Sequence, residues 1–270
     1  MVAEGHGPVT KPLSASNARV KEARKLSRRS VRTERRLFLV EGWKALEAAA
    51  EVGCVVEVFA TPEAAAQHAR LLAGLEVSLV EQRALESLAD AVTPQGLVAV
   101  CRPVDVSLDA LTADGALRTI VICADVRDPG NAGAVIRCAD AAGADAVVLA
   151  GDAVDLYNPK TIRASVGSAF HLPVAIERDV AAAIAWAKGQ GLTVLAADGS
   201  GELSLFDAHE TLVAPTAWLF GNEARGLSED LLDVADHRVA IPILGRAESL
   251  NLATAAALCL YASAQARHER

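Results

Sequence analysis

Short apolar runs alternate with amphipathic stretches along this chain, and the two kinds of segment have the lengths of strands and helices. In the first part, runs enriched in Val and Leu predict strands at 37–40, 55–60, 77–80 and 97–101. The stretches between them predict helices at 17–32, 43–52, 62–72 and 82–90. Thr61-Pro62 supplies an N-cap followed by proline, which is typical of a helix start. This alternation predicts a small α/β domain over residues 17–104.

The second half repeats the alternation with more strongly apolar strands. Continuous β-branched runs such as 119–124 and 146–149 are typical of strands that are buried on both faces of a parallel sheet. Further strands are predicted at 192–196, 217–220 and 238–241, and helices at 131–142, 179–189, 228–235 and 250–265. Strands that alternate with helices imply βαβ units. We therefore predict an α/β fold whose larger, parallel-sheet domain covers residues 118–270.

Two segments lie outside the predicted domains. Residues 105–117 are polar and contain Asp, so they predict a linker. Residues 1–16 are rich in Gly, Pro and Ser, a composition that predicts a disordered lead.

Cysteine, histidine and hydropathy patterns narrow the class of protein. The five cysteines are odd in number and never in C-x-x-C spacing, and the six histidines lack ligand spacing. We therefore expect no disulfide framework, no metal and a cytoplasmic location. The longest near-continuous apolar stretch, 252–264, is shorter than the ~20 residues that span a bilayer. No apolar segment follows the basic N-terminal residues, so we expect neither a secretory signal nor a membrane contact.

The charge distribution indicates a polyanionic partner. The net charge is −8, yet residues 1–40 contain ten basic and three acidic residues. A basic segment on an acidic body is the electrostatic footprint expected for phosphate backbones, although a solvated helix face is the plainer interpretation. Helical spacing places Lys21, Arg24, Lys25, Arg28 and Arg32 on one stripe. The candidate RNA contacts in this segment are Arg19, Lys21, Arg28, Arg29 and Arg32.

Three polar loops follow predicted strands, at the sheet edge where open α/β sheets bind ligands. They are D-P-G-N-A-G at 128–133, L-F-G-N-E-A-R-G-L at 219–227, and I-P-I-L-G at 241–245 followed by E-S-L-N at 248–251. The segment 157–165, Y-N-P-K-T-I-R-A-S, adds the cations Lys160 and Arg163. These loops predict a ligand site on the second domain.

Several residues in these loops have both a structural and a functional interpretation. Asn131 is a favoured N-cap residue, and Ser249 and Asn251 would cap the last helix or present polar groups to a ligand. Arg137 interrupts an apolar helical stretch, so it requires either a structural ion pair or a substrate. The phosphate loops G-x-G-x-x-G and G-x-x-x-x-G-K-[ST] and the G-x-S-x-G elbow are missing. The residues themselves therefore indicate an α/β ligand-binding domain beside a basic segment.

Taken in order, three motifs resemble those of the SpoU (TrmH-like) branch of the SPOUT RNA methyltransferases. They are D-P-G-N-A-G-A-V-I-R (128–137), L-F-G-N-E-A-R-G-L-S (219–228) and I-P-I-L-G-R-A-E-S-L-N-L-A (241–253), and the resemblance covers about 118–265. It implies S-adenosylmethionine as cofactor, RNA as substrate and partner, and 2′-O-methylation of ribose as the reaction. It also implies a homodimer and a deep C-terminal trefoil knot, which the residue pattern alone does not predict because true knots are nearly absent from proteins.

The resemblance also implies roles for single residues. Gly221, Ile241 and Leu250 would hold S-adenosylmethionine, largely through backbone groups, with Leu219 on the adenine side. Asn131, Arg137, Glu223, Ser249 and Asn251 would form the catalytic site, and Arg163 would contact the RNA substrate or the cofactor. Lys160, placed beside the same loops, is a further candidate RNA contact, although a solvated helix face is the plainer interpretation of this residue. A guanidinium pKa above ~12 makes Arg137 a poor base. We therefore expect Arg137 to stabilise the developing alkoxide or to orient a phosphate, acting across the dimer interface as often described for the family.

The first domain resembles the substrate-binding domain, similar to ribosomal protein L30e, that precedes many SpoU enzymes. N-A-R-V-K-E-A-R-K-L (17–26), F-L-V-E-G (38–42) and V-T-P-Q-G-L-V-A-V (92–100) carry this likeness. Domains of this type recognise kinked or looped RNA. The resemblance implies ribosomal, 23S-type RNA as the substrate, because the well-known tRNA-modifying members of the family often lack this domain.

Three alternatives stay open at the level of sequence. One is a tRNA 2′-O-methyltransferase, and another is a non-catalytic RNA-binding or ribosome-assembly factor with the same fold. The five candidate catalytic residues argue against a pure binder. A metabolic α/β enzyme is the third alternative, and the basic segment 19–36 argues against it.

Overall fold

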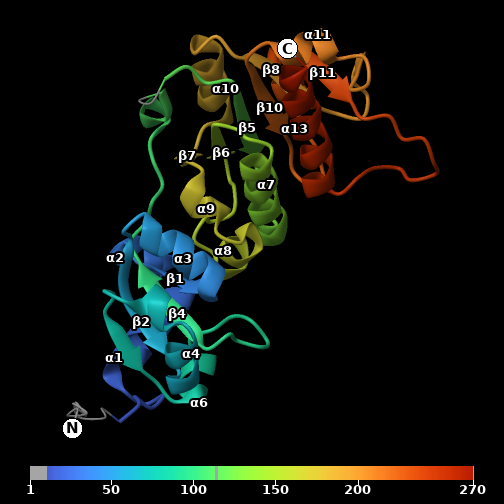
Figure 1. The fold of residues 1–270 in the computed structure, drawn as a ribbon. Coiled ribbons are helices and arrows are strands. Elements are labelled where there is room, and N and C mark those ends of the chain that lie inside the picture. The colour runs from blue at the N-terminus through green and yellow to red at the C-terminus, as the bar shows by residue number, and fades with distance from the viewer. Residues whose placement is uncertain (1–10, 113–114, 270) are drawn as a thin grey trace. The chain divides into compact units, whose positions relative to one another are not determined.

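The computed structural model describes residues 11–112 and 115–269, and the chain divides into two compact units after Pro103 (Figure 1). The first unit is built on a four-stranded sheet with the order β1-β4-β2-β3. Its strands are β1 (Phe38–Glu41), β2 (Val55–Ala60), β3 (Val77–Leu79) and β4 (Leu97–Cys101). Strand β4 is antiparallel to β1 and β2, and β2 is parallel to β3. The four predicted strands are confirmed to within one residue.

The helices of the first unit are shorter than predicted. They are α1 (Ala18–Arg24), α2 (Arg29–Arg35), α3 (Trp43–Glu51), α4 (Pro62–Gln67), α5 (Ala69–Leu72) and α6 (Gln82–Glu86), with a 3₁₀ turn, η1, at Lys25–Ser27. The single helix predicted over 17–32 is wrong, because Arg28 adopts an extended conformation (φ −92°, ψ 129°) between η1 and α2. The basic stripe predicted along that helix is therefore interrupted.

Residues 11–16 are ordered, contrary to the predicted disordered lead, whose residues 1–10 lie outside the described part of the chain. The Leu13 N–H donates to the Leu79 carbonyl (2.8 Å), and the Leu13 carbonyl accepts from the Glu81 N–H (2.9 Å). Leu13 and Ala15 also pack against the apolar core of the unit. Backbone pairing and two apolar side chains thus anchor a segment whose Gly, Pro and Ser content predicts disorder.

The second unit is built on a seven-stranded sheet with the order β7-β6-β5-β10-β8-β11-β9, in which each pair of neighbouring strands is parallel. Its strands are β5 (Thr119–Ala124), β6 (Ala146–Ala150), β7 (Val174–Glu177), β8 (Thr193–Ala197), β9 (Leu203–Ser204), β10 (Thr216–Phe220) and β11 (His237–Ala240). The predicted α/β fold with a parallel sheet is confirmed, and the predicted strands are found. Strands β7 and β9 were not among the predicted strands.

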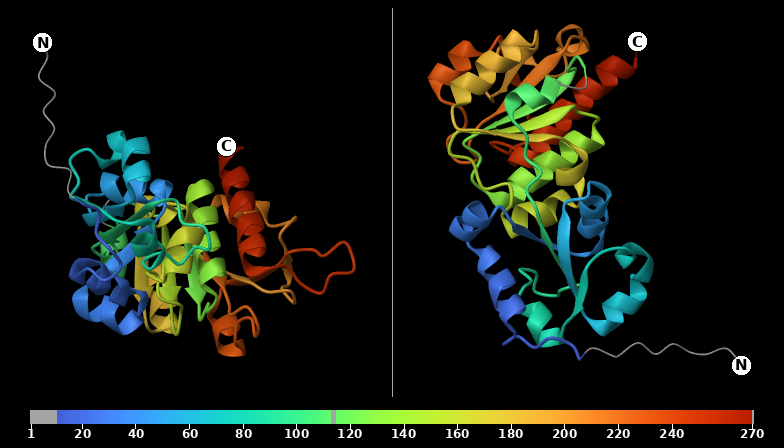
Figure 2. Two further views of the ribbon diagram at one scale, coloured as in Figure 1. Left: turned by 90° about the horizontal axis from the view of Figure 1, so that it is seen from below. Right: turned by 90° about the vertical axis from the view of Figure 1, so that its left-hand side faces the viewer.

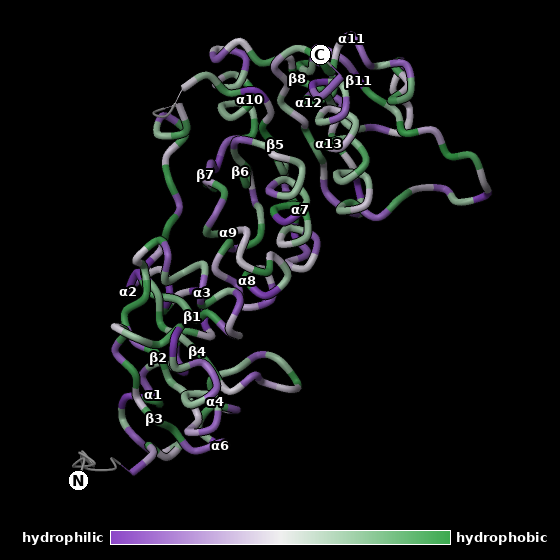
Figure 3. Tube along the Cα trace, in the orientation of Figure 1, coloured by the Kyte–Doolittle hydropathy of each residue, from purple (hydrophilic) through white to green (hydrophobic). Residues whose placement is uncertain are grey.

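Helices lie on both faces of this sheet (Figure 2). They are α7 (Pro129–Ala141), α8 (Pro159–Ser165), α9 (Ser168–His171), α10 (Val180–Gly189), α11 (His209–Val213), α12 (Glu229–Val234) and α13 (Leu252–His268), with a 3₁₀ turn, η2, at Leu108–Thr112. Side chains from α10 and α12 pack on one face with Ile120 and Ile122. On the other face the Trp218 indole N–H donates to the Ser263 hydroxyl of α13 (2.9 Å). Single polar residues interrupt the mostly apolar helix α7 (Figure 3), whose buried residues include Val135, Ile136 and Ala139.

The segment expected as a linker belongs, in its described part, to the second unit. Val106 forms a parallel bridge with Ala175, and Leu111 is buried in the core of this unit. The Tyr157 hydroxyl donates to the Asp105 carboxylate (2.6 Å) and accepts from the N–H groups of Val104 and Asp105 (2.7 Å each). Composition alone predicts a linker for this polar segment, whereas its attachment to the second unit depends on Tyr157, which lies 52 residues after Asp105.

Sheet topology determines where the polar loops meet. Strand β10 lies between β5 and β8, so the loops that follow these three parallel strands share one edge of the sheet. Among the described helices, none has the length and apolar character needed to cross a membrane.

Candidate active site

Helix α7 begins at the first polar loop, and its N-cap is Asp128 rather than Asn131. The Asp128 carboxylate accepts a hydrogen bond from the Asn131 N–H (2.8 Å), and Pro129 occupies the first helical turn. That N–H bond and the neighbouring Lys160 hold the pKa of Asp128 below its ordinary value. The Asn131 side chain is therefore not needed for capping.

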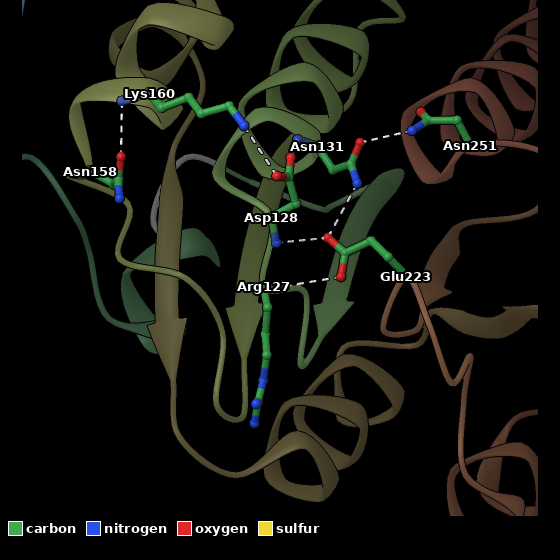
Figure 4. Close-up of polar contacts among 7 residues, drawn as sticks. All are labelled: Arg127, Asp128, Asn131, Asn158, Lys160, Glu223 and Asn251. Carbon is green, nitrogen blue, oxygen red and sulfur yellow. Dashed lines mark hydrogen bonds and ion pairs between the residues drawn. The ribbon is translucent and has the colours of Figure 1, made fainter. Parts of the chain in front are cut away.

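The Asn131 amide instead joins two other loops (Figure 4). Its Nδ2 donates to Glu223 Oε1 (3.3 Å), and its Oδ1 accepts from Asn251 Nδ2 (2.9 Å). The Asn251 Oδ1 caps α13 by accepting from the Ala253 N–H (2.9 Å). One residue from each of the three sequence motifs thus takes part in a single network, and both hydrogen-bonding ends of the Asn131 amide are oriented by it.

Glu223 is held as a carboxylate by the first loop. Its oxygens accept from the N–H groups of Arg127 (3.2 Å) and Asp128 (2.9 Å), while the Arg127 side chain points away from the network (Figure 4). Burial alone would raise the pKa of Glu223, but the backbone hydrogen bonds and the Asn131 amide outweigh it and lower the pKa. A carboxylate with a lowered pKa is a weak base, so Glu223 is suited to positioning Asn131.

A second contact holds the second loop against the first. The Asn222 Nδ2 donates to the carbonyl of Asp125 (2.8 Å), which follows β5 and adopts a left-handed φ of 53°. The backbones of Asn222 and Gly226 exchange two hydrogen bonds (3.1 and 2.8 Å), which close the second loop into a tight turn. Asn222 was part of the quoted motif but was not among the predicted site residues.

A cavity of about 240 Å³ lies beside this network. Three of the four predicted cofactor residues line it, namely Gly221, Ile241 and Leu250, together with the predicted catalytic residues Glu223 and Ser249. The fourth, Leu219, does not line the cavity, because its side chain is fully buried in the core of the unit. Alternation along β10 directs the next residue, Phe220, to the cavity instead.

Other lining residues were missed from the sequence. They include Asp198, Gly199, Ile243 and Glu248. Asp198 and Gly199 follow β8, which neighbours β10. The rule that ligands bind beyond the carboxyl ends of parallel strands was a signal that could have identified them.

Arg137 lies on the exposed side of α7, whereas Val135, Ile136 and Ala139 are buried. It forms no ion pair or hydrogen bond with another described residue. The expectation that Arg137 interrupts a buried face is therefore wrong, since the apolar residues beside it in sequence point in other directions. Arg137 is also not joined to the Asn131 network by any contact within the unit, and its guanidinium is available to a ligand or a second chain.

The predicted RNA contacts fall into two groups. Arg32 is buried and donates to the carbonyls of Leu26 (2.9 Å) and Ser27 (2.8 Å), so it supports the turn between α1 and α2. Arg19 forms ion pairs with Glu57 (2.7 Å) and Glu76 (2.8 Å), and Lys160 with Asp128 (3.2 Å).

The remaining predicted RNA contacts differ from one another in exposure and in interaction partners. Lys21, Arg28 and Arg29 are exposed and form no ion pair with a described residue, whereas Arg163 is half-buried on α8 and has polar partners. The first three are therefore the better candidates for contacts with phosphate. Within residues 11–112 and 115–269, no group of three or more His, Cys, Asp or Glu side chains is arranged to hold a metal ion.

The lowered pKa of Glu223 leads to a prediction about acid stability. Because the folded pKa lies below the ordinary value of 4.5, the ionised carboxylate stabilises the fold above about pH 4.5, and this contribution is lost as the pH falls through the folded pKa. We expect Glu223→Gln to be less stable than the native chain at pH 7, with a difference that shrinks towards pH 3. Urea unfolding across this range measures it. A stability difference between the two proteins that stayed constant or grew towards pH 3 would contradict a lowered pKa for Glu223.

Both units resemble known proteins. Residues 118–261 match the model of the SpoU rRNA Methylase family, and residues 17–99 match an MRM3-like substrate binding domain. The chain is 33% identical over 250 residues to the 23S rRNA (guanosine(2553)-2′-O)-methyltransferase RlmP of Bacillus subtilis, covering 92% of this chain and 96% of that protein.

Solved structures show the same fold. The SpoU methyltransferase AviRb from Streptomyces viridochromogenes, in complex with AdoMet, matches with a TM-score of 0.82 and 31% identity, over 93% of this chain and 98% of that one. An AdoMet-bound rRNA methyltransferase from Sinorhizobium meliloti matches with a TM-score of 0.81 and 31% identity, over 94% and 96% of the two chains.

Proposed function

The chain belongs to the SpoU rRNA methylase family, and from this premise we propose that it transfers the methyl group of S-adenosylmethionine to a ribose 2′-hydroxyl of 23S ribosomal RNA. The observation that carries the proposal is the network in which Asn131, Glu223 and Asn251, one from each motif, meet beside the cavity. The first-domain match to a substrate binding domain and the 23S specificity in the name of the Bacillus relative favour ribosomal RNA over tRNA.

The cavity suits the proposed cofactor chemically. Ile241, Ile243 and Leu250 offer apolar surface for a purine, and the carboxylates of Asp198 and Glu248 suit the polar and cationic groups of the cofactor. Gly221 lines the wall with backbone atoms alone, because it has no side chain. When bound, S-adenosylmethionine supplies an electrophilic methyl group on a sulfonium.

The side chains around the cavity would position the acceptor alcohol. Asn131 uses one N–H and one oxygen lone pair within its network, so one N–H and one lone pair stay available to a ribose. Glu223 and Asn251 fix the plane of that amide, which is the kind of orientation that lowers the barrier of a two-reactant step. Arg137 would stabilise the negative charge that develops on the 2′-oxygen or bind the adjoining phosphate. Ser249 completes the wall of the cavity.

Exposure of Arg137 supports a homodimer in which this residue reaches the partner's site. A cation without an ion pair in its own unit fits a role completed by a second chain. Analytical ultracentrifugation tests the dimer, and a species of 28.1 kDa alone would reject it.

We also expect the family's trefoil knot in the C-terminal part of the second unit. A cytoplasmic location is in keeping with the five free cysteines.

A transfer assay tests the choice of RNA. The purified protein and tritiated S-adenosylmethionine are incubated in three separate reactions, with unmodified transcripts of 23S rRNA, 16S rRNA or tRNA. We expect label in 23S rRNA only. Label in tRNA at a comparable rate would contradict the proposed substrate, and label in none of the three would contradict methyl transfer to these RNAs.

A further inference from the structure

Two motifs of the first unit form one corner that presents a tryptophan. The Glu41 carboxylate accepts from the N–H groups of Asp90 (3.0 Å) and Ala91 (3.1 Å), and Gln95 Oε1 accepts from the Trp43 N–H (3.4 Å). Gly42 has a φ of +88°, and a Cβ there would lie 2.9 Å from Gln95 Oε1. Gln95 of the V-T-P-Q-G segment therefore holds the first residue of α3, and Glu41 of F-L-V-E-G holds the two residues that precede V-T-P-Q-G.

The indole of Trp43 lies in an aromatic and cationic cluster. It stacks on the His68 ring with 6.0 Å between ring centroids and an interplanar angle of 21°. The Lys44 ammonium lies 5.4 Å from the Trp43 ring centroid, within the range of a cation–π contact. The pair borders an open depression of about 710 Å³, whose other polar lining residues are Glu47, Gln67 and Arg70.

Packing of α3 does not require this tryptophan. The helix is attached to its sheet by Ala45, Leu46, Ala48 and Ala49, which are buried, whereas Trp43 is only half-buried. A half-exposed indole that stacks on a second ring, with Lys44 beside it and Arg70 lining the same depression, is the kind of arrangement that proteins use to stack unpaired bases. Lys44 and Arg70 are exposed and would reach the flanking phosphates.

We propose that the Trp43–His68 pair stacks an unpaired base of the substrate RNA, with Lys44 and Arg70 contacting the phosphates beside it. Glu47 and Gln67, in the same depression, offer hydrogen bonds to the edge of that base. The proposal rests on the proposed function, since it names how the first unit holds the RNA that the second unit methylates.

Steady-state kinetics with 23S rRNA test the stacking. We expect Trp43→Ala to raise the KM for RNA between about fivefold and a hundredfold, the range that loss of one stacked base produces. The kcat and the affinity for S-adenosylmethionine should stay near those of the native chain, and Trp43→Phe should retain most of the RNA affinity. Thermal unfolding of each variant shows whether it is folded. An unchanged KM for folded Trp43→Ala, as expected if the surface binds a protein instead, would overturn the proposal.

Fluorescence provides a readout that is independent of turnover. Stacking of a base quenches an indole, so a single-stranded oligouridylate should quench the native chain more strongly than it quenches Trp43→Phe. Equal quenching of the two proteins would overturn the stacking proposal. Absence of RNA methylation by the native chain, with stronger quenching of the native chain, would count against the proposed function alone. Arg70→Ala has a matched control in Arg83→Ala, another exposed arginine of the same unit. An equal loss of affinity in both would reject the local phosphate contact.

Discussion

Arg137→Ala is expected to lower the rate of methyl transfer by about a hundredfold or more, the size of effect seen when a group that stabilises developing oxyanion charge is removed. The residue is exposed and has no ion pair or hydrogen bond within the described part of the chain, so stability should be unchanged. It is not among the residues that line the cavity, so the affinity for S-adenosylmethionine should also be unchanged. Single-turnover kinetics with 23S rRNA and calorimetric binding of the cofactor measure the two effects.

Arg178→Ala is the matched control, because Arg178 is also exposed in the second unit without an ion pair to a described residue. It should leave the rate near that of the native chain. A mixture of Arg137→Ala and Asn131→Ala chains should recover part of the activity, since a mixed dimer would contain one site with both residues intact. Near-normal turnover by Arg137→Ala would contradict its role, and a mixture no more active than its components would place Arg137 in the site of its own chain.

Gly221→Ala is expected to impair the cofactor site through the backbone. A Cβ at this position would lie 2.3 Å from the Gly226 carbonyl carbon and 2.5 Å from the Leu227 nitrogen, so the second loop has to shift. Overpacking of this kind costs about 1–3 kcal/mol. Because the loop carries Asn222 and Glu223, we expect a lower midpoint of thermal unfolding and a loss of cofactor affinity of at least about tenfold.

Gly245→Ala is the control for this substitution. Gly245 lies in the third loop, and a Cβ there would meet no atom within 4 Å. Calorimetric titration with S-adenosylmethionine should give near-native affinity for Gly245→Ala. If Gly221→Ala bound the cofactor as tightly as Gly245→Ala, the second loop would not be a wall of the cofactor site.

Local patterns were sufficient to predict the strands and the convergence of the polar loops. Continuous apolar runs such as 119–124 are typical of parallel strands, and such strands place the loops that follow them at one edge. The order of the strands cannot be read from periodicity, yet it decides which loops are neighbours. In this chain β10 lies between β5 and β8, which brings Asp198 to the cavity.

Single side chains were harder to predict, because their roles depend on neighbours that are distant in sequence. Asn131 and Asp128 are both good N-cap residues, and only the position of Glu223 across the loop shows which of them is released from capping. Leu219 and Phe220 differ only in the face of β10 to which they point. The break at Arg28 came from a 3₁₀ turn that Arg32 stabilises, a contact that helical periodicity does not reveal.

The position of the transferred methyl group tests the central claim most directly. A 2′-O-methyl group blocks alkaline cleavage of the adjoining phosphodiester, whereas a methyl group on a base does not. 23S rRNA labelled by the native chain with tritiated S-adenosylmethionine should therefore release its label in alkali-stable dinucleotides. Label released entirely in mononucleotides would contradict transfer to the ribose.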